Sequence, residues 1–105
     1  MNDLVTDKLH QAAPEDSMSR ELAIVNKKGL HARATAKFVQ CCEKFDAVIT
    51  VSRGDETVGG SSIMGILTLG ASQGATITVT ATGPQAKAAL DALETLVANR
   101  FGEDE

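Results

Sequence analysis

The chain of 105 residues contains no tryptophan and no tyrosine, and only three phenylalanines. Proteins that bind single-stranded nucleic acid stack its bases on aromatic side chains, so this composition argues against nucleic-acid binding. The chain also lacks the run of roughly 18 apolar residues that a membrane-spanning helix needs. Its first residues lack the basic and apolar stretches of a signal peptide. We therefore expect a cytoplasmic protein that binds neither nucleic acid nor a membrane.

Cysteine and histidine are also scarce, with two residues of each type. Cys41 and Cys42 are adjacent, and neighbouring residues on a helix point in different directions, which disfavours a disulfide between them. Two thiols with only His10 and His31 give no recognisable zinc spacing. We expect the cysteines to pack in the core, His10 to be solvated, and no metal to be bound.

Charge is unevenly distributed along the chain, whose formal net charge is −4 at pH 7. Residues 1–17 carry a net charge of −3 and residues 101–105 another −3, which leaves +2 for residues 18–100. We predict one folded domain over 18–100, a disordered acidic N-terminal extension over 1–17 and an acidic C-terminal tail over 101–105. A stretch of the domain without acids favours an anionic ligand or an acidic partner. Its basic residues are Lys27, Lys28, Arg33 and Lys37.

The spacing of apolar residues predicts four strands and three helices. Apolar runs and alternating patterns predict strands at about 22–25, 47–52, 57–58 and 76–80. Helical spacing predicts helices over about 32–45, 63–69 and 84–101. The order βαββαβα and the single apolar face of each helix predict an α+β fold, an open-faced β-sandwich. Three helices cover one face of a four-stranded antiparallel sheet, and the other face, rich in Thr and Ser, is wet.

His31 is the residue with the clearest chemical potential. It stands at the expected start of the first helix, where unpaired N–H groups and the helix dipole favour anions. Arg33 lies in the first turn, and its guanidinium can donate several hydrogen bonds to phosphate oxygens. Because an imidazole nitrogen is a nucleophile towards phosphorus, this pair predicts a histidine that becomes phosphorylated.

These residues alone leave two other functions open. In a small regulatory domain that binds a ligand or a protein, His31 would serve only as a helix cap. In a small phosphatase, Asn26 or Thr35 would have to position the attacking water.

Two separated motifs resemble the HPr family, the histidine-containing phosphocarriers of the phosphoenolpyruvate-dependent phosphotransferase system. The first is Gly29-Leu30-His31-Ala32-Arg33, and the second extends from Gly60 to Gly70 with Ser61-Ser62-Ile63-Met64 near its start. The resemblance covers roughly residues 19–100, includes the order of the elements, and implies the fold described above.

The resemblance also implies roles for individual residues. His31 would be phosphorylated on Nδ1 and Arg33 would stabilise the phosphoryl group. Ser62 matches the serine that a dedicated HPr kinase/phosphorylase modifies in many members, although it could also only cap its helix. The surface that docks the partners would consist of Ala32, Ile63, Met64 and Leu67, with Ile66 and Leu69 of the same helix facing the core.

The resemblance implies a carrier and not an enzyme. An enzyme I-type protein would donate the phosphoryl group and an enzyme IIA-type protein would accept it. Neither a cofactor nor a metal is implied, and the carrier is expected to be a monomer.

Three features of the chain depart from the usual pattern of the family, and the last two bear on its branch. Ala34 stands where many members have proline, which removes some rigidity but no chemical group. The stretch Ala81–Gln85 and the acidic residues 101–105 resemble NPr, the nitrogen-related branch. Ser61 and Gly65 stand near places where sugar-transport members carry lysines. We therefore expect a regulatory, nitrogen-type phosphorelay.

Overall fold

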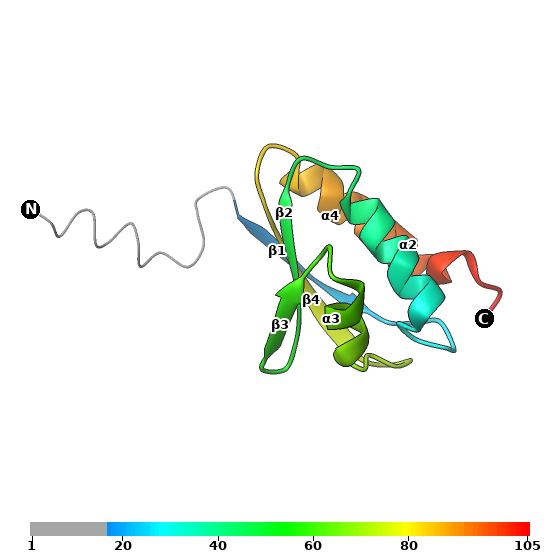
Figure 1. Ribbon diagram of the computed structural model, residues 1–105. Helices are drawn as coiled ribbons and strands as arrows, with labels where there is room; N and C mark the ends of the chain where they lie inside the picture. The colour runs from blue at the N-terminus through cyan, green and yellow to red at the C-terminus, as the bar shows by residue number, and fades with distance from the viewer. Residues whose placement is uncertain (1–16) are drawn as a thin grey trace, which may run out of the picture.

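Four strands and three α-helices follow one another along residues 17–105, the part of the chain that the computed structural model describes (Figure 1). The elements are β1 (Met18–Ala23), α2 (Ala32–Cys42), β2 (Val48–Arg53), β3 (Glu56–Gly59), α3 (Ile63–Thr68), β4 (Thr76–Thr82), α4 (Ala86–Ala98) and the short 3₁₀ helix η1 (Arg100–Gly102). This order confirms the predicted α+β fold. His10 and most of the predicted N-terminal extension lie outside the described residues.

The strands form one antiparallel sheet in the order β1-β4-β2-β3. Strand β4 is central because it pairs with β1 on one side, where Ile77 faces Leu22, and with β2 on the other, where Val79 faces Val51. The strict alternation of branched residues in β4 matches this position, since every second side chain enters the core.

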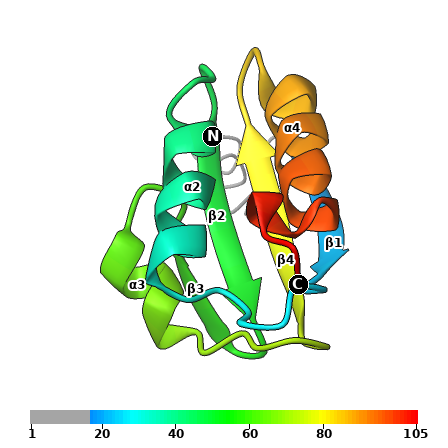
Figure 2. The same cartoon turned by 90° about the vertical axis from the view of Figure 1, so that its right-hand side faces the viewer.

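The two faces of the sheet differ in polarity, as the sequence predicts. Helices α2 and α4 lie side by side over one face, and α3 packs beside α2 (Figure 2). The opposite face carries hydroxyl side chains that bond to one another across strands. The Ser19 and Thr80 oxygens are 2.8 Å apart, as are those of Ser52 and Thr57.

Several element boundaries differ from the predicted ones. Helix α2 ends at Cys42 and not near residue 45, because the N–H groups of Lys44 and Phe45 bond to carbonyls only three residues back. Strand β1 begins at Met18, four residues before the apolar run, because it pairs with β4 along its whole length. The pattern of neighbouring residues does not reveal that a segment pairs with a strand more than 50 residues away.

The C-terminal residues pack on the domain, which differs from the expectation of a separate tail over 101–105. Phe101 is 1% exposed and belongs to the core. Arg100 and Phe101 adopt left-handed φ values of 59° and 56°, which reverse the chain after α4. Lys37 of α2 donates a hydrogen bond to the Phe101 carbonyl at 2.7 Å. The chain end therefore reaches the loop that leads into α2 (Figure 2).

No helix among residues 17–105 has both the length and the apolar character needed to cross a membrane.

Candidate functional site

The loop between β1 and α2 is fixed by a close approach of two backbones. Gly29 has a φ of +67°, and a Cβ atom at this position would lie 2.7 Å from the Ala71 carbonyl oxygen and 2.8 Å from Ser72 Cα. The next residue, Leu30, donates its N–H to the same Ala71 oxygen at 2.9 Å. Only glycine satisfies both the φ angle and the close contact. The loop is thereby held where it delivers His31 to the start of α2.

His31 is the N-cap residue of α2, with extended backbone angles. Its carbonyl accepts the first helical hydrogen bond, from Thr35 N–H at 2.8 Å. The helix therefore has no internal acceptor for the N–H groups of residues 32–34, and these contribute the positive end of the helix dipole. The predicted placement of His31 at a helix start is confirmed.

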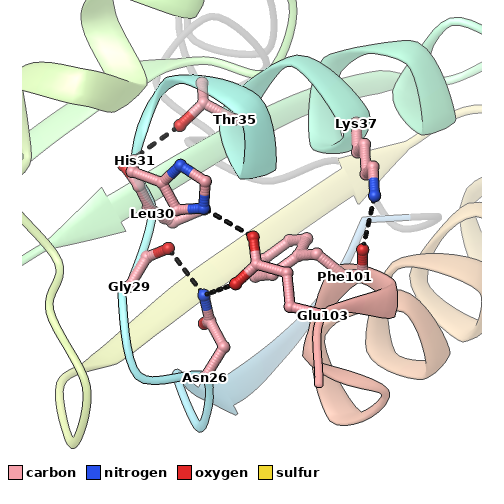
Figure 3. A network of polar contacts seen from close by, with 8 residues as sticks. All are labelled: Asn26, Gly29, Leu30, His31, Thr35, Lys37, Phe101 and Glu103. Atoms are coloured by element: carbon pink, nitrogen blue, oxygen red, sulfur yellow. Dashed lines mark hydrogen bonds and ion pairs between the residues drawn. The ribbon is translucent and has the colours of Figure 1, made fainter. Parts of the chain in front are cut away.

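The imidazole of His31 is hydrogen-bonded to the carboxylate of Glu103, which lies 72 residues later in the chain. Its Nε2 atom lies 2.5 Å from Oε2 of Glu103. The side chains are partly covered, at 28% exposure for His31 and 19% for Glu103. The other ring nitrogen, Nδ1, faces the first turn of α2 (Figure 3).

Asn26 holds the second oxygen of the same carboxylate. Its Nδ2 atom donates to Glu103 Oε1 at 3.0 Å and to the Gly29 carbonyl at 2.8 Å. Both neighbours are acceptors, so the NH₂ group of the buried amide must face them. The hydrogen bonds from His31 and Asn26 hold the pKa of the Glu103 carboxyl below its usual range. Glu103 is therefore a carboxylate at neutral pH.

A hollow of about 520 Å³ surrounds this pair. Three segments of the chain line it, two of them with basic residues and one with acidic residues. The first two segments contribute Lys27, Lys28, His31, Ala32 and Arg33, and the acidic segment contributes Glu103, Asp104 and Glu105. Within residues 17–105, Arg33 forms no ion pair, and its exposed side chain is available to an incoming anion. Lys27 pairs weakly with Glu105, at 3.5 Å, and both side chains are exposed.

Helix α3 presents an apolar surface beside α2. Ser62 caps the helix, as predicted, because its Oγ accepts the Gly65 N–H at 2.9 Å. Ile63 and Met64 are 42% and 70% exposed, and Leu67 is half-buried. The expectation that Ile66 and Leu69 face the core is confirmed, since both are buried.

Other residues singled out in the sequence have structural roles. Asn26 and Thr35 are fully buried and bonded to the loop, Thr35 through its hydroxyl to the Leu30 carbonyl at 3.2 Å. Neither is placed to hold an attacking water. Cys41 and Cys42 pack against the core as free thiols, as predicted. Burial raises the pKa of the Cys42 thiol to about 12, so it stays protonated and unreactive.

Glu103 was not predicted to contact His31. Among residues 101–105, the residue that is atypical of a solvated acidic tail is Phe101, a large apolar residue followed by glycine. That single phenylalanine was the available signal, because a buried aromatic side chain carries the residues that follow it onto the domain surface.

The sequence matches one family over nearly all of the described residues. A family profile described as "PTS HPr component phosphorylation site" matches residues 18–99. The phosphocarrier protein HPr of Cupriavidus necator is 46% identical over 88 residues, which cover 84% of this chain and 99% of that relative. The phosphocarrier protein NPr of Shewanella violacea is 42% identical over 86 residues, which cover 82% and 94%.

The structure is similar to solved members of the same family. The crystal structure of HPr-C-His from Thermoanaerobacter tengcongensis superimposes with a TM-score of 0.80 at 41% identity, covering 84% of this chain and 99% of that one. An HPr from Bacillus anthracis gives a TM-score of 0.74 at 38% identity, with coverage of 77% and 96%. Identity and fold agree across the whole domain, and the chain belongs to the HPr family, the phosphocarrier proteins of the phosphotransferase system, which carry a phosphoryl group and are not enzymes.

Proposed function

We propose that His31 is the residue of this carrier that receives and releases the phosphoryl group. The donor is a phosphohistidine of an enzyme I-type protein, and the acceptor is a histidine of an enzyme IIA-type protein. The observation that carries this assignment is the position of His31, whose Nδ1 faces the first turn of α2 in a hollow bordered by Lys28 and Arg33 (Figure 3). A dianionic group there meets helix N–H donors and basic side chains together.

The transfer step balances without a proton leaving or entering His31. The Nδ1 lone pair forms the new N–P bond, while the N–P bond of the donor breaks and its electron pair returns to the donor ring. The positive charge moves with the phosphoryl group, from the donor imidazolium to the ring of His31. Arg33 lines the same hollow, and its guanidinium would stabilise the phosphoryl oxygens during the transfer.

The docking surface proposed for both partners joins Ala32 of α2 to Ile63, Met64 and Leu67 of α3. The exposure of Ile63 and Met64 supports this role, because two large apolar side chains lie next to each other at the surface of a short helix. A small apolar patch beside basic residues fits brief encounters, in which charge steers association and the limited area permits rapid release. A monomer presents this surface without competition from another copy.

Ser62 is the proposed regulatory site, modified by an HPr kinase/phosphorylase. Its hydroxyl is exposed at the start of α3, next to Ile63 and Met64. A phosphate here carries about −1.5 to −2 charges at pH 7, next to the apolar docking surface. Covering that charge with a partner surface is costly. Phosphorylation of Ser62 would therefore slow phosphorylation of His31.

The process served is proposed to be a regulatory, nitrogen-type phosphorelay. The stretch Ala81–Gln85, and Ser61 and Gly65 beside the docking surface, support this assignment, as does the likeness to an NPr protein. The matched HPr proteins reach 46% identity, so the acceptor must be identified directly. Transfer from the phosphorylated carrier to a nitrogen-related and to a sugar-specific enzyme IIA should be measured side by side. Faster transfer to the sugar-specific protein would reject the nitrogen-type assignment.

The function itself is tested by labelling. Incubation with phosphoenolpyruvate and an enzyme I-type protein should give an acid-labile mass gain on the intact chain. The gain should be lost in His31→Ala and retained in His10→Ala, which removes the other histidine. Labelling that survives in His31→Ala would assign the phosphoryl group to another residue. If the wild-type chain is not labelled, the carrier function is rejected, and the alternative of a binding domain in which His31 only caps α2 is favoured.

A further inference from the structure

We propose that Glu103 is a positioning residue for His31, fixing the ring so that Nδ1 faces the incoming phosphoryl group with a free lone pair. This inference rests on the proposed phosphorylation of His31. Glu103 lies 72 residues from His31 in the chain and reaches it through the turn after α4.

The distance between the two side chains decides where the ring proton lies. Nε2 of His31 and Oε2 of Glu103 are 2.5 Å apart, and a carboxylate oxygen can only accept. Two lone pairs at this separation would repel each other, so Nε2 carries the hydrogen. In the neutral imidazole the other nitrogen, Nδ1, then has the free lone pair that attack on phosphorus requires.

The carboxylate occupies the side of the ring that the reaction does not use. Nε2 points to Glu103, while Nδ1 faces the first turn of α2 (Figure 3). Glu103 therefore orients the ring without occupying the position of the phosphoryl group. A carboxylate on the far nitrogen of a reacting histidine sets the tautomer and orientation in the same way in Ser-His-Asp enzymes.

Asn26 makes this arrangement rigid. Its buried NH₂ group bridges Glu103 Oε1 and the Gly29 carbonyl, so the carboxylate is tied to the same loop that carries His31. Both oxygens of Glu103 thus accept a hydrogen bond, one from each of these residues. A glutamine at position 103 has one oxygen and can accept from only one of them in this geometry.

Glu103 also meets the charge that the reaction creates. When Nδ1 of the neutral ring forms the N–P bond, Nε2 keeps its hydrogen and the ring becomes a phosphoimidazolium. The adjacent carboxylate stabilises this positive charge without taking the proton. Removing the carboxylate should therefore slow the transfer step itself and leave association with the donor nearly unchanged.

The test compares Glu103→Gln with Asp55→Asn, which also removes one negative charge but lies in the exposed turn between β2 and β3, outside the hollow. Single-turnover transfer from phosphorylated enzyme I should slow roughly tenfold to hundredfold in Glu103→Gln at saturating donor, the scale of losing a residue that orients a histidine. The donor concentration for half-saturation should stay within about twofold, and Asp55→Asn should match the wild type. Glu103→Asp, which keeps the charge, should recover part of the rate.

A second readout reports the ring directly and needs no transfer. Nitrogen NMR of His31 should show the Nε2–H form in the wild type and in Asp55→Asn, and a mixture of tautomers in Glu103→Gln. Thermal unfolding of each variant identifies loss of fold, in which case Glu103→Asp carries the comparison.

The outcomes separate this inference from the proposed function. If the wild type is labelled on His31 and Glu103→Gln accepts the phosphoryl group as fast as Asp55→Asn, or faster, the positioning role is overturned and the proposed function stands. An unchanged tautomer in Glu103→Gln would overturn it as well. If the wild type accepts no phosphoryl group on His31, the proposed function fails first.

Discussion

Replacing Gly29 by alanine should destabilise the protein more than the same change at Gly54. Both glycines have a left-handed φ, +67° and +61°, so both substitutions carry the same conformational cost of roughly 1–2 kcal/mol. At Gly54, in the turn between β2 and β3, an added Cβ meets nothing within 4 Å. At Gly29 it would lie 2.7 Å from a backbone oxygen and 2.8 Å from Ser72 Cα, and neither atom belongs to a flexible side chain.

The close contact at Gly29 adds an overpacking cost of about 1–3 kcal/mol to the conformational one. Urea unfolding of the two variants should thus give losses of about 1–2 kcal/mol for Gly54→Ala and about 2–5 kcal/mol for Gly29→Ala. Because the loop must move, His31 labelling should also slow in Gly29→Ala and stay normal in Gly54→Ala. Equal losses of stability in the two variants would show that the loop gives way freely and does not fix His31.

Three further outcomes follow from the site. Arg33→Ala should slow phosphoryl transfer by roughly tenfold to a thousandfold, and a rate within twofold of the wild type would show that helix N–H groups suffice. Ser62→Ala should lower the free energy of unfolding by about 1 kcal/mol. Ser62→Asp should keep the fold and slow the labelling of His31. An unchanged labelling rate in Ser62→Asp would show that Ser62 only caps α3 and has no regulatory role. The pKa of Glu103 is lower in the folded chain than its ordinary value of 4.5, so its stabilising contribution is complete above about pH 4.5 and is lost as the pH falls through the folded pKa. The stability difference between wild type and Glu103→Gln should therefore shrink as the pH falls below about 4.5 in urea titrations, and a constant difference would contradict the assigned hydrogen bonds.

The sequence predicts those parts of the molecule that depend on local spacing. The alternation in β4, the helix start at His31 and the cap at Ser62 all follow from residues within a few positions of one another, and the structure has them where they were expected. The full length of β1 and the contact of Glu103 with His31 depend on partners more than 50 residues away. Local patterns carry no record of such partners, so the hydrogen bond between the His31 ring and Glu103 could not be predicted.

Residues 101–105 show the physical reason most clearly. Their charges alone indicate a solvated tail. Burial of Phe101 contributes about 1.5–3 kcal/mol on its own, which is comparable to the cost of the left-handed residues that reverse the chain. A single apolar side chain thus determines the path of the acids beside it.

The long sequence separation between His31 and Glu103 also places the assembly of the site late in folding. A contact across 72 residues closes only after the intervening sheet and α4 have ordered, because closure of so long a loop costs entropy that earlier contacts must offset. In the folded protein, the same contact is the first to open if η1 detaches, since such local openings need not disturb the central strands. Hydrogen exchange at the amides of 100–103 would therefore time the opening of the site separately from unfolding of β4.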